Sequence, residues 1–272
     1  MSARANPVPP SSLERVVARD RWIIAAALIA LAALSWTYLL VLDRQMGDMS
    51  AAPRMAEMPG MPGMEAAGAS PSPFLPTALM WLVMMIGMMV PSAAPMILMF
   101  GSVQRRQLAA ESPAIRVALF LAGYLAAWGA FSVLAAAAQV ALTDLAVLAP
   151  MELAVAGWAG PLLVALAGIY ELAPLKNVCL RHCRSPAEFL SNHWRRGSAG
   201  ALRMGMEHGL YCVGCCWPLM GLLFVVGVMN LAWVVAIAAF VLVQKLVPHG
   251  EIIARVGGVA LLLLAAYLAL SA

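Results

Sequence analysis

Seven apolar segments, each roughly 20 residues long, constrain the fold of this chain more than any other feature of its sequence. An apolar helix of about 20 residues spans the hydrocarbon core of a bilayer, where the backbone must satisfy its own hydrogen bonds. Only 11% of the 272 residues are charged, against about 25% in an average soluble domain. We therefore expect an all-α fold, a polytopic transmembrane helical bundle, and exclude a soluble enzyme domain or a secreted disulfide scaffold. The expected spans are Trp22–Leu42, Phe74–Phe100, Ala114–Leu142, Leu153–Leu172, Met206–Val228, Leu231–Val247 and Ile252–Leu270.

The basic residues are unevenly divided between the two sides of such a seven-span bundle. Lys and Arg in short connections are retained on the cytoplasmic side of a membrane. Only Arg44 and Arg54 fall on the opposite side, which predicts that the N-terminus is inside and the C-terminus outside. The residues assigned to the inner side are Arg4, Arg15, Arg19, Arg21, Arg105, Arg106, Lys176, Arg181, Arg184, Arg195, Arg196, Arg203, Lys245 and Arg255.

The expected spans divide the chain into four parts. Residues 1–21 form a cytoplasmic N-terminal tail, and residues 22–42 form the first transmembrane helix, which is too long for the apolar region of a cleaved signal peptide. Residues 43–73 form an outside loop rich in Met, Pro and Gly. Residues 74–272 form a six-helix membrane domain with a basic cytoplasmic loop at 174–205.

A cysteine-rich motif in the fifth expected span is the strongest candidate for chemistry. At helical spacing, His208, Cys212 and Cys215 lie at i, i+4 and i+7 and share one face, with Cys216 beside them. Thiolates select Cu(I), zinc or iron–sulfur clusters, and imidazole suits copper and zinc. Buried cysteines also occur simply as small apolar residues. Ionisable groups inside a span are costly and typical of function, however, so we predict a metal or redox site here.

A second pair of thiols lies in the basic loop. Cys179 and Cys183 are one helical turn apart, so both could face a soft metal at the inner surface. The alternative is a basic juxtamembrane loop with incidental thiols. The predicted metal ligands are His208, Cys212, Cys215, Cys216, Cys179 and Cys183.

Methionines are the compositional outlier, and most of the 19 lie in the outside loop or on the second expected span. In the loop they recur every third residue among Pro and Gly, which favours polyproline II with the thioethers along one edge. Such an array suits capture of Cu(I). The candidate capture ligands are Met55, Met58, Met61 and Met64.

The methionines of the second span form a stripe, which is more often core packing than a row of ligands. A metal relay from the outside to the cysteines would require the second and fifth spans to be adjacent. The candidate relay residues are Met84, Met85, Met88 and Met89.

Several motifs resemble those of a bacterial family of predicted metal-binding integral membrane proteins, formerly a domain of unknown function. The similar stretches are Met80–Met96, Leu175–Arg184, His193–Gly197 and His208–Trp217 with Met229-Asn230, and the resemblance covers about residues 74–255. It implies a multi-pass protein of the bacterial inner (cytoplasmic) membrane that handles a metal. It also implies a small companion protein as a partner.

The pattern as a whole favours a Cu(I)-handling protein that transports copper or delivers it to a cuproenzyme, with zinc as a second candidate metal. No phosphate-binding loop is present in the sequence, which argues against an ATP-driven pump. A membrane thiol–disulfide oxidoreductase using two Cys pairs is an alternative, as is a structural subunit of a larger complex. Binding is favoured over catalysis. The expected partners are the lipid bilayer and a companion protein or cuproenzyme, not nucleic acid.

Overall fold

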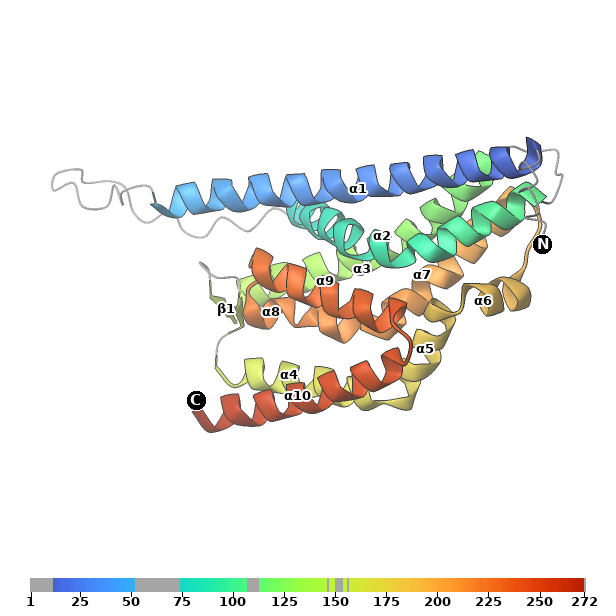
Figure 1. Cartoon of the computed structure of the whole chain (residues 1–272). Coiled ribbons are helices and arrows are strands. Elements are labelled where there is room, and N and C mark those ends of the chain that lie inside the picture. The colour runs from blue at the N-terminus through green and yellow to red at the C-terminus, as the bar shows by residue number, and fades with distance from the viewer. Residues whose placement is uncertain are drawn as a thin grey trace, which may run out of the picture.

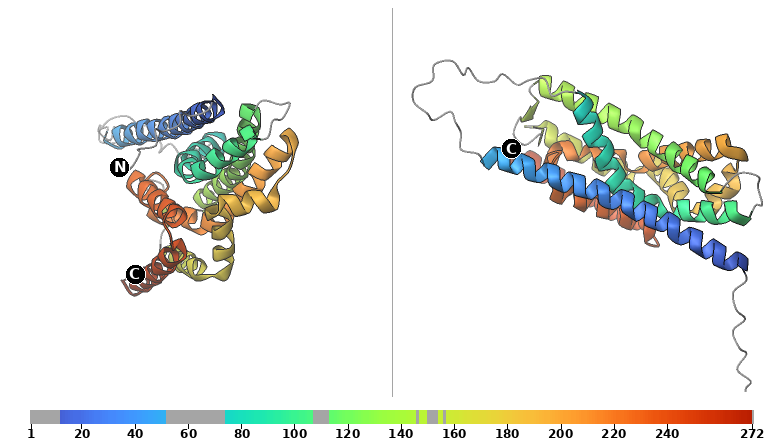
Figure 2. Two further views of the ribbon diagram at one scale, coloured as in Figure 1. Left: turned by 45° about the vertical axis from the view of Figure 1, so that its right-hand side comes forward. Right: turned by 90° about the horizontal axis from the view of Figure 1, so that it is seen from above.

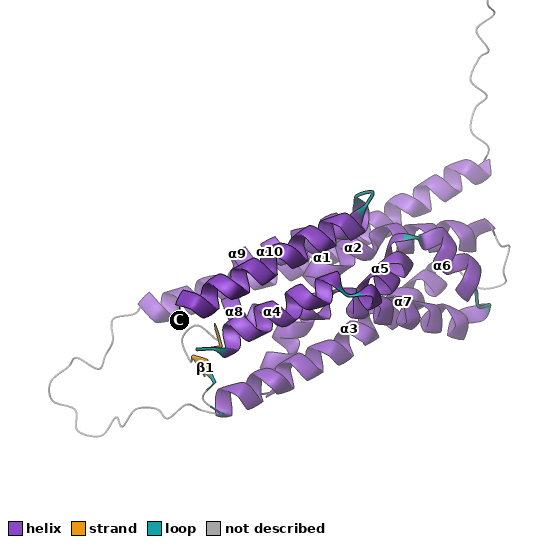
Figure 3. Cartoon of the chain, turned by 90° about the horizontal axis from the view of Figure 1, so that it is seen from below, coloured by secondary structure: helices purple, strands orange, loops and turns teal. Residues whose placement is uncertain are grey.

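The computed structural model describes residues 12–51, 74–106, 113–145, 147–149, 154–155 and 157–271. This part of the chain is helical apart from one short antiparallel hairpin and the connecting turns (Figure 3). The all-α prediction is therefore confirmed for it. The elements are α1 Ser12–Ala51, α2 Phe74–Arg106, α3 Pro113–Asp144, β1 Leu148–Ala149, β2 Ala154–Val155, α4 Ala159–Leu172, α5 Pro174–Arg184, α6 Pro186–His193, α7 Gly197–Gly221, α8 Leu223–Val226, α9 Leu231–Leu246 and α10 Gly250–Ser271.

Five helices of the described chain are long and apolar enough to cross a membrane. These are α1, α2, α3, α7 with its extension α8, and α10. Helices α4 and α5 add a sixth span if they are counted together, although the chain bends by 65° between them. Helix α9 has 16 residues and is shorter than a typical span. Membrane-spanning character is thus supported, and the seven-span count and the N-inside orientation stay predictions.

Prolines and glycines explain where the helices differ from the expected spans. Helix α4 begins at Ala159, not at Leu153, after Gly157 adopts a positive φ of 67°. Residues 174–205 contain α5, α6 and the first turns of α7, because Pro174 and Pro186 each start a new helix at its first turn. At the other end, α1 continues to Ala51, beyond the expected end of the first span.

The helices form three layers (Figures 1 and 2). Helix α1 lies along α2 on one side of the bundle, and α4 pairs with α10 on the opposite side. Helices α2, α3, α7 and α9 lie between them, and α5 and α6 close the end of the bundle at which α1 begins. The central layer is the more buried, since 56% of the span window of α2 but only 17% of that of α1 is buried. Polar groups of the central helices are therefore the ones removed from lipid and water.

Glycines allow α7 to lie close against α3. A Cβ added at Gly205 would overlap the carbonyl group of Phe120, and one at Gly209 would come within 2.7 Å of the Ala127 Cβ. Gly123 of α3 meets the backbone of α7 at Leu202 in the same way. This close crossing places the cysteine-bearing helix inside the bundle.

Candidate metal centre

Four of the five cysteines form a buried thiol cluster, which we define as Cys183, Cys212, Cys215 and Cys216. Cys183 comes from α5 and the other three from α7, and none of the four is more than 9% exposed. The Sγ atoms of Cys183 and Cys215 are 3.9 Å apart, and Cys183 also interacts with Cys212. Helix periodicity correctly predicted that the α7 cysteines share a face. All five cysteines are free thiols in this structure.

Two of these thiols are anchored to the backbone of their own helix. The Sγ atoms of Cys215 and Cys216 donate to the carbonyl oxygen of Cys212 at 3.1 and 3.0 Å. The Cys212 sulfur, by contrast, contacts side chains from other helices. It is therefore the thiol whose surroundings are set by the tertiary fold.

Lys245 of α9 is the cation of the thiol cluster. Its Nζ donates to Cys212 Sγ at 2.9 Å and to Ser92 Oγ at 3.1 Å, and its charge interacts with the other three thiols of the cluster. Lys245 is only 7% exposed. A positive charge beside a sulfur favours the thiolate, which is the form that binds metals.

Helix α3 contributes a third neighbour of the Cys212 sulfur. The hydroxyl of Tyr124 lies 3.1 Å from Cys212 Sγ and donates to the carbonyl oxygen of Met89 at 3.1 Å. Ser92 donates to the same carbonyl at 2.8 Å, so its oxygen is free to accept from Lys245. Tyr124 and Ser92 thus tie α2 to the thiol cluster.

Three residues of the site, Lys245, Tyr124 and Ser92, were not predicted from the sequence. Lys245 was counted among the charges of the inner side, and the structure adds that it is buried among the thiols. Lys176, also counted with the inner charges, is fully buried as well. The sequence does place a lysine inside an apolar segment, and such a lysine is by default a candidate functional residue.

Lys176 belongs to a separate buried ionic cluster at the bend between α4 and α5. Its Nζ forms an ion pair with Glu171 and donates to Gln244 Oε1 at 2.9 Å, while Gln244 Nε2 donates to Glu171 at 2.9 Å. All three side chains are at most 1% exposed. Helix α9 therefore connects both buried polar clusters, through Gln244 and its neighbour Lys245.

The other residues predicted as ligands, relay or capture sites lie outside the thiol cluster. His208 is buried, and its ring packs against Phe120, Tyr124 and Phe189, with no hydrogen-bond partner at Nδ1. Cys179 lies one turn before Cys183 and faces the backbone of Gly214. The methionines of the predicted relay are buried on α2. Met55, Met58, Met61 and Met64 lie outside the described residues.

The expected contact between the second and fifth spans is indirect. Helix α7 packs mainly against α3, which also lies along α2, and α2 and α7 are not among the close helix pairs of the described chain. Tyr124 and Lys245 bridge the gap from α2 to Cys212. A relay from the methionines would therefore pass α3 and α9.

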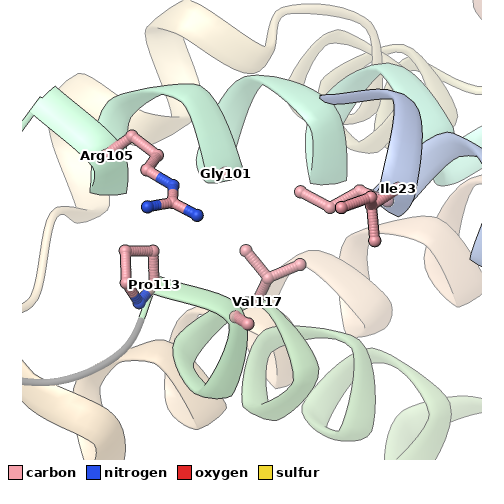
Figure 4. Close-up of a pocket in the computed structure, with 7 residues that line it drawn as sticks. Ile23, Gly101, Arg105, Pro113 and Val117 are labelled. Carbon is pink, nitrogen blue, oxygen red and sulfur yellow. The ribbon is translucent and has the colours of Figure 1, made fainter. Parts of the chain in front are cut away.

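No three His, Cys, Asp or Glu side chains among the described residues are arranged as a metal site. Outside the thiol cluster, a mainly apolar cavity of about 270 Å³ lies between α1, α2 and α3, with the Arg105 side chain at its edge (Figure 4). It contains none of the predicted ligands. The thiol cluster, with its 3.9 Å sulfur pair, is therefore the strongest candidate centre.

The fold and the thiol cluster together define a class, an all-helical membrane-type protein with a cluster of thiols in its core. A sequence model of the family described as PpoB2, copper chaperone, matches residues 78–268. The chain belongs to this family, which supports a copper-related function and the resemblance to a metal-related bacterial family. No curated protein and no solved structure matches the chain.

Proposed function

We propose that this protein is an integral membrane protein that binds Cu(I) as cargo at the thiol cluster and either transports it or delivers it to a cuproenzyme. The observation that carries the proposal is the 3.9 Å separation of Cys183 and Cys215 Sγ in the buried core. Two sulfurs that bind one metal at about 2.3 Å each are about 3.8 Å apart at a tetrahedral angle, as in zinc sites, and about 4.0 Å apart where three ligands surround the ion in a plane. The pair is thus spaced to share an ion, and Cys212 is close to both.

Lys245 supports this proposal through charge balance. A Cu(I) ion held by two thiolates carries one net negative charge, which is costly in an apolar core unless a cation lies beside it. The Lys245 ammonium is already in that position. Copper bound to the thiol cluster would therefore be neutralised locally.

The other predicted residues take supporting roles in the proposal. His208 and Cys216 lie beside the ligands on α7. Cys179 lies one turn before Cys183 on α5, and the buried methionines of α2 form the relay. The methionines of the loop at 43–73 capture the ion. Zinc would suit the thiols equally well, but thioethers favour Cu(I), which is why copper is preferred. The recipient is a small companion protein or a cuproenzyme.

Copper stoichiometry in the purified protein tests this function. We expect about one tightly bound Cu(I) per chain in detergent, measured by inductively coupled plasma mass spectrometry after loading under reducing conditions. Cys212→Ser/Cys215→Ser should lower this by about tenfold or more, because it removes thiolate ligands. Met206→Leu, which removes an exposed sulfur on the same helix, is the matched control. Full retention of copper by the double variant would refute the site.

A thiol–disulfide function is the alternative that the same sulfurs allow. Cys183 and Cys215 would have to approach from 3.9 Å to about 2.05 Å to form a bond. Alkylation of freshly isolated protein with and without reductant separates the two functions by mass. Five alkylated thiols without reductant favour metal binding, and an oxidised Cys183–Cys215 pair favours redox exchange.

A further inference from the structure

Two histidines outside the thiol cluster lie side by side where α5, α6 and α7 meet. The rings of His182 of α5 and His193 of α6 have centroids 6.0 Å apart at an interplanar angle of 77°. Both side chains are half-buried, so they are shielded from the surroundings but remain accessible. The ligands of the proposed function do not include either residue.

Backbone hydrogen bonds determine the tautomer of both imidazoles. His182 Nδ1 lies 2.8 Å from the Val178 carbonyl oxygen, and His193 Nδ1 lies 3.2 Å from that of Phe189. A carbonyl oxygen can only accept, so each Nδ1 carries a proton, and in the neutral ring Nε2 is then the nitrogen with the lone pair. Metal-binding histidines commonly donate their second ring N–H to the backbone in this way.

Aromatic neighbours hold the two rings in place. Tyr211 stacks on His182 with centroids 4.3 Å apart and an angle of 6°, and Phe189 stacks on His193 at 4.6 Å and 11°. A metal lies about 3 Å from the centre of an imidazole ring that binds it at about 2 Å, so one ion can join rings about 6 Å apart. The centroid separation of 6.0 Å therefore leaves room for one two-coordinate ion between the rings.

Helix α5 links the histidine pair to the thiol cluster. His182 precedes Cys183, whose sulfur is 3.9 Å from that of Cys215. The arginines of this end are engaged elsewhere, since Arg181 pairs with Glu251 and both Arg195 and Arg203 pair with Glu207. In Figure 1, α5 and α6 lie at the end of the bundle where α1 begins.

We propose that His182 and His193 form a second Cu(I) site, at which cargo is exchanged between the thiol cluster and a partner. This inference rests on the proposed function. Transfer breaks the bonds from copper to the two Nε2 atoms and forms bonds to the cysteine sulfurs, whose thiol protons pass to solvent. Copper remains Cu(I) throughout. Neutral imidazoles hold the ion more weakly than thiolates, so the pair is suited to transient binding.

Titration of the full-length protein with Cu(I) alone, followed by X-ray absorption spectroscopy, tests this site. The wild type should bind two equivalents, a tight one coordinated by sulfur and a weaker one coordinated by nitrogen. His182→Phe/His193→Phe keeps the aromatic stacking and should lose only the nitrogen-coordinated equivalent. His249→Asn changes an exposed histidine in the turn after α9 to a residue that tolerates its positive φ of 64°, and this control should keep both equivalents.

The outcomes separate this site from the thiol site. Unchanged binding by the double Phe variant, or a wild type with only the sulfur-coordinated equivalent, would overturn the histidine site. A wild type with only the nitrogen-coordinated equivalent would overturn the thiol site while supporting the histidines. Cys212→Ser/Cys215→Ser should lose only the tight equivalent, which gives the reciprocal result.

Discussion

At the scale of single residues, the charge on Lys245 distinguishes the thiol cluster from an ordinary set of buried cysteines. A lysine inside an apolar helix is costly unless it has a partner, and here the partners are Cys212 and Ser92. Helix periodicity predicted the shared face of the α7 cysteines. It could not predict Lys245 or Tyr124, because these residues reach Cys212 from 33 and 88 positions away in the sequence.

Replacing Lys245 should weaken copper binding without removing a ligand. Lys245→Met keeps the length of the side chain but removes the charge, and a charge-assisted hydrogen bond contributes about 1.5–3 kcal/mol. We expect about 10- to 100-fold weaker Cu(I) affinity in a chelator competition assay. Arg255→Gln removes an exposed charge and serves as the control. Wild-type affinity in Lys245→Met would show that the ammonium does not stabilise bound copper.

At the scale of the elements, the close crossing of α3 and α7 positions the thiol cluster. The glycines of α7 permit this close packing. The partner helix could not be predicted from the sequence, because several apolar helices would fit equally well. The same limit applies to the second span, which contacts the thiols through α3 and α9. Periodicity identifies the faces of helices, while the pairing of those faces depends on the whole bundle.

Gly205→Ala should push α3 and α7 apart. The new Cβ would overlap the Phe120 carbonyl group, which is backbone and has little freedom to move. We expect a loss of about 1–3 kcal/mol, seen as a lower thermal unfolding midpoint in detergent, together with weaker copper binding. Gly221→Ala is the control, since a Cβ there meets no atom within 4 Å. Equal midpoints for the two variants would contradict this role of the crossing.

The ionic cluster at the bend of α4 and α5 allows a second test at this scale. Glu171→Gln or Lys176→Met alone leaves a buried charge without its partner and should destabilise the protein by about 3–5 kcal/mol. The double variant should be less destabilised than the sum of the two, because neither charge remains. A thermal double-mutant cycle measures this coupling. Strict additivity would mean that the pair does not act as a unit.

At the scale of the whole molecule, the open question is how many times the chain crosses the membrane. Hydropathy predicted seven spans, and the structure supports five or six by length because α4 is bent against α5 and α9 is short. Both departures come from helix ends at prolines and glycines. A hydropathy window averages over these single residues and therefore does not detect the helix ends. The buried lysines also show that a count of basic residues overestimates the charge available to set orientation.

Reporter fusions at the two termini distinguish an odd from an even number of spans. With seven spans and the N-terminus inside, a C-terminal alkaline phosphatase fusion should be active and a C-terminal fluorescent protein fusion dark. An N-terminal fluorescent protein fusion should be bright. Six spans would place both termini on the same side and reverse the C-terminal result.

The central claim is that copper is held by sulfur inside the bundle, and X-ray absorption of the protein loaded with one equivalent of Cu(I) tests it most directly. We predict a first shell of sulfur only in the wild type, and loss of at least one sulfur from that shell in Cys183→Ser. A first shell of nitrogen or oxygen, or an identical sulfur shell in Cys183→Ser, would contradict the account.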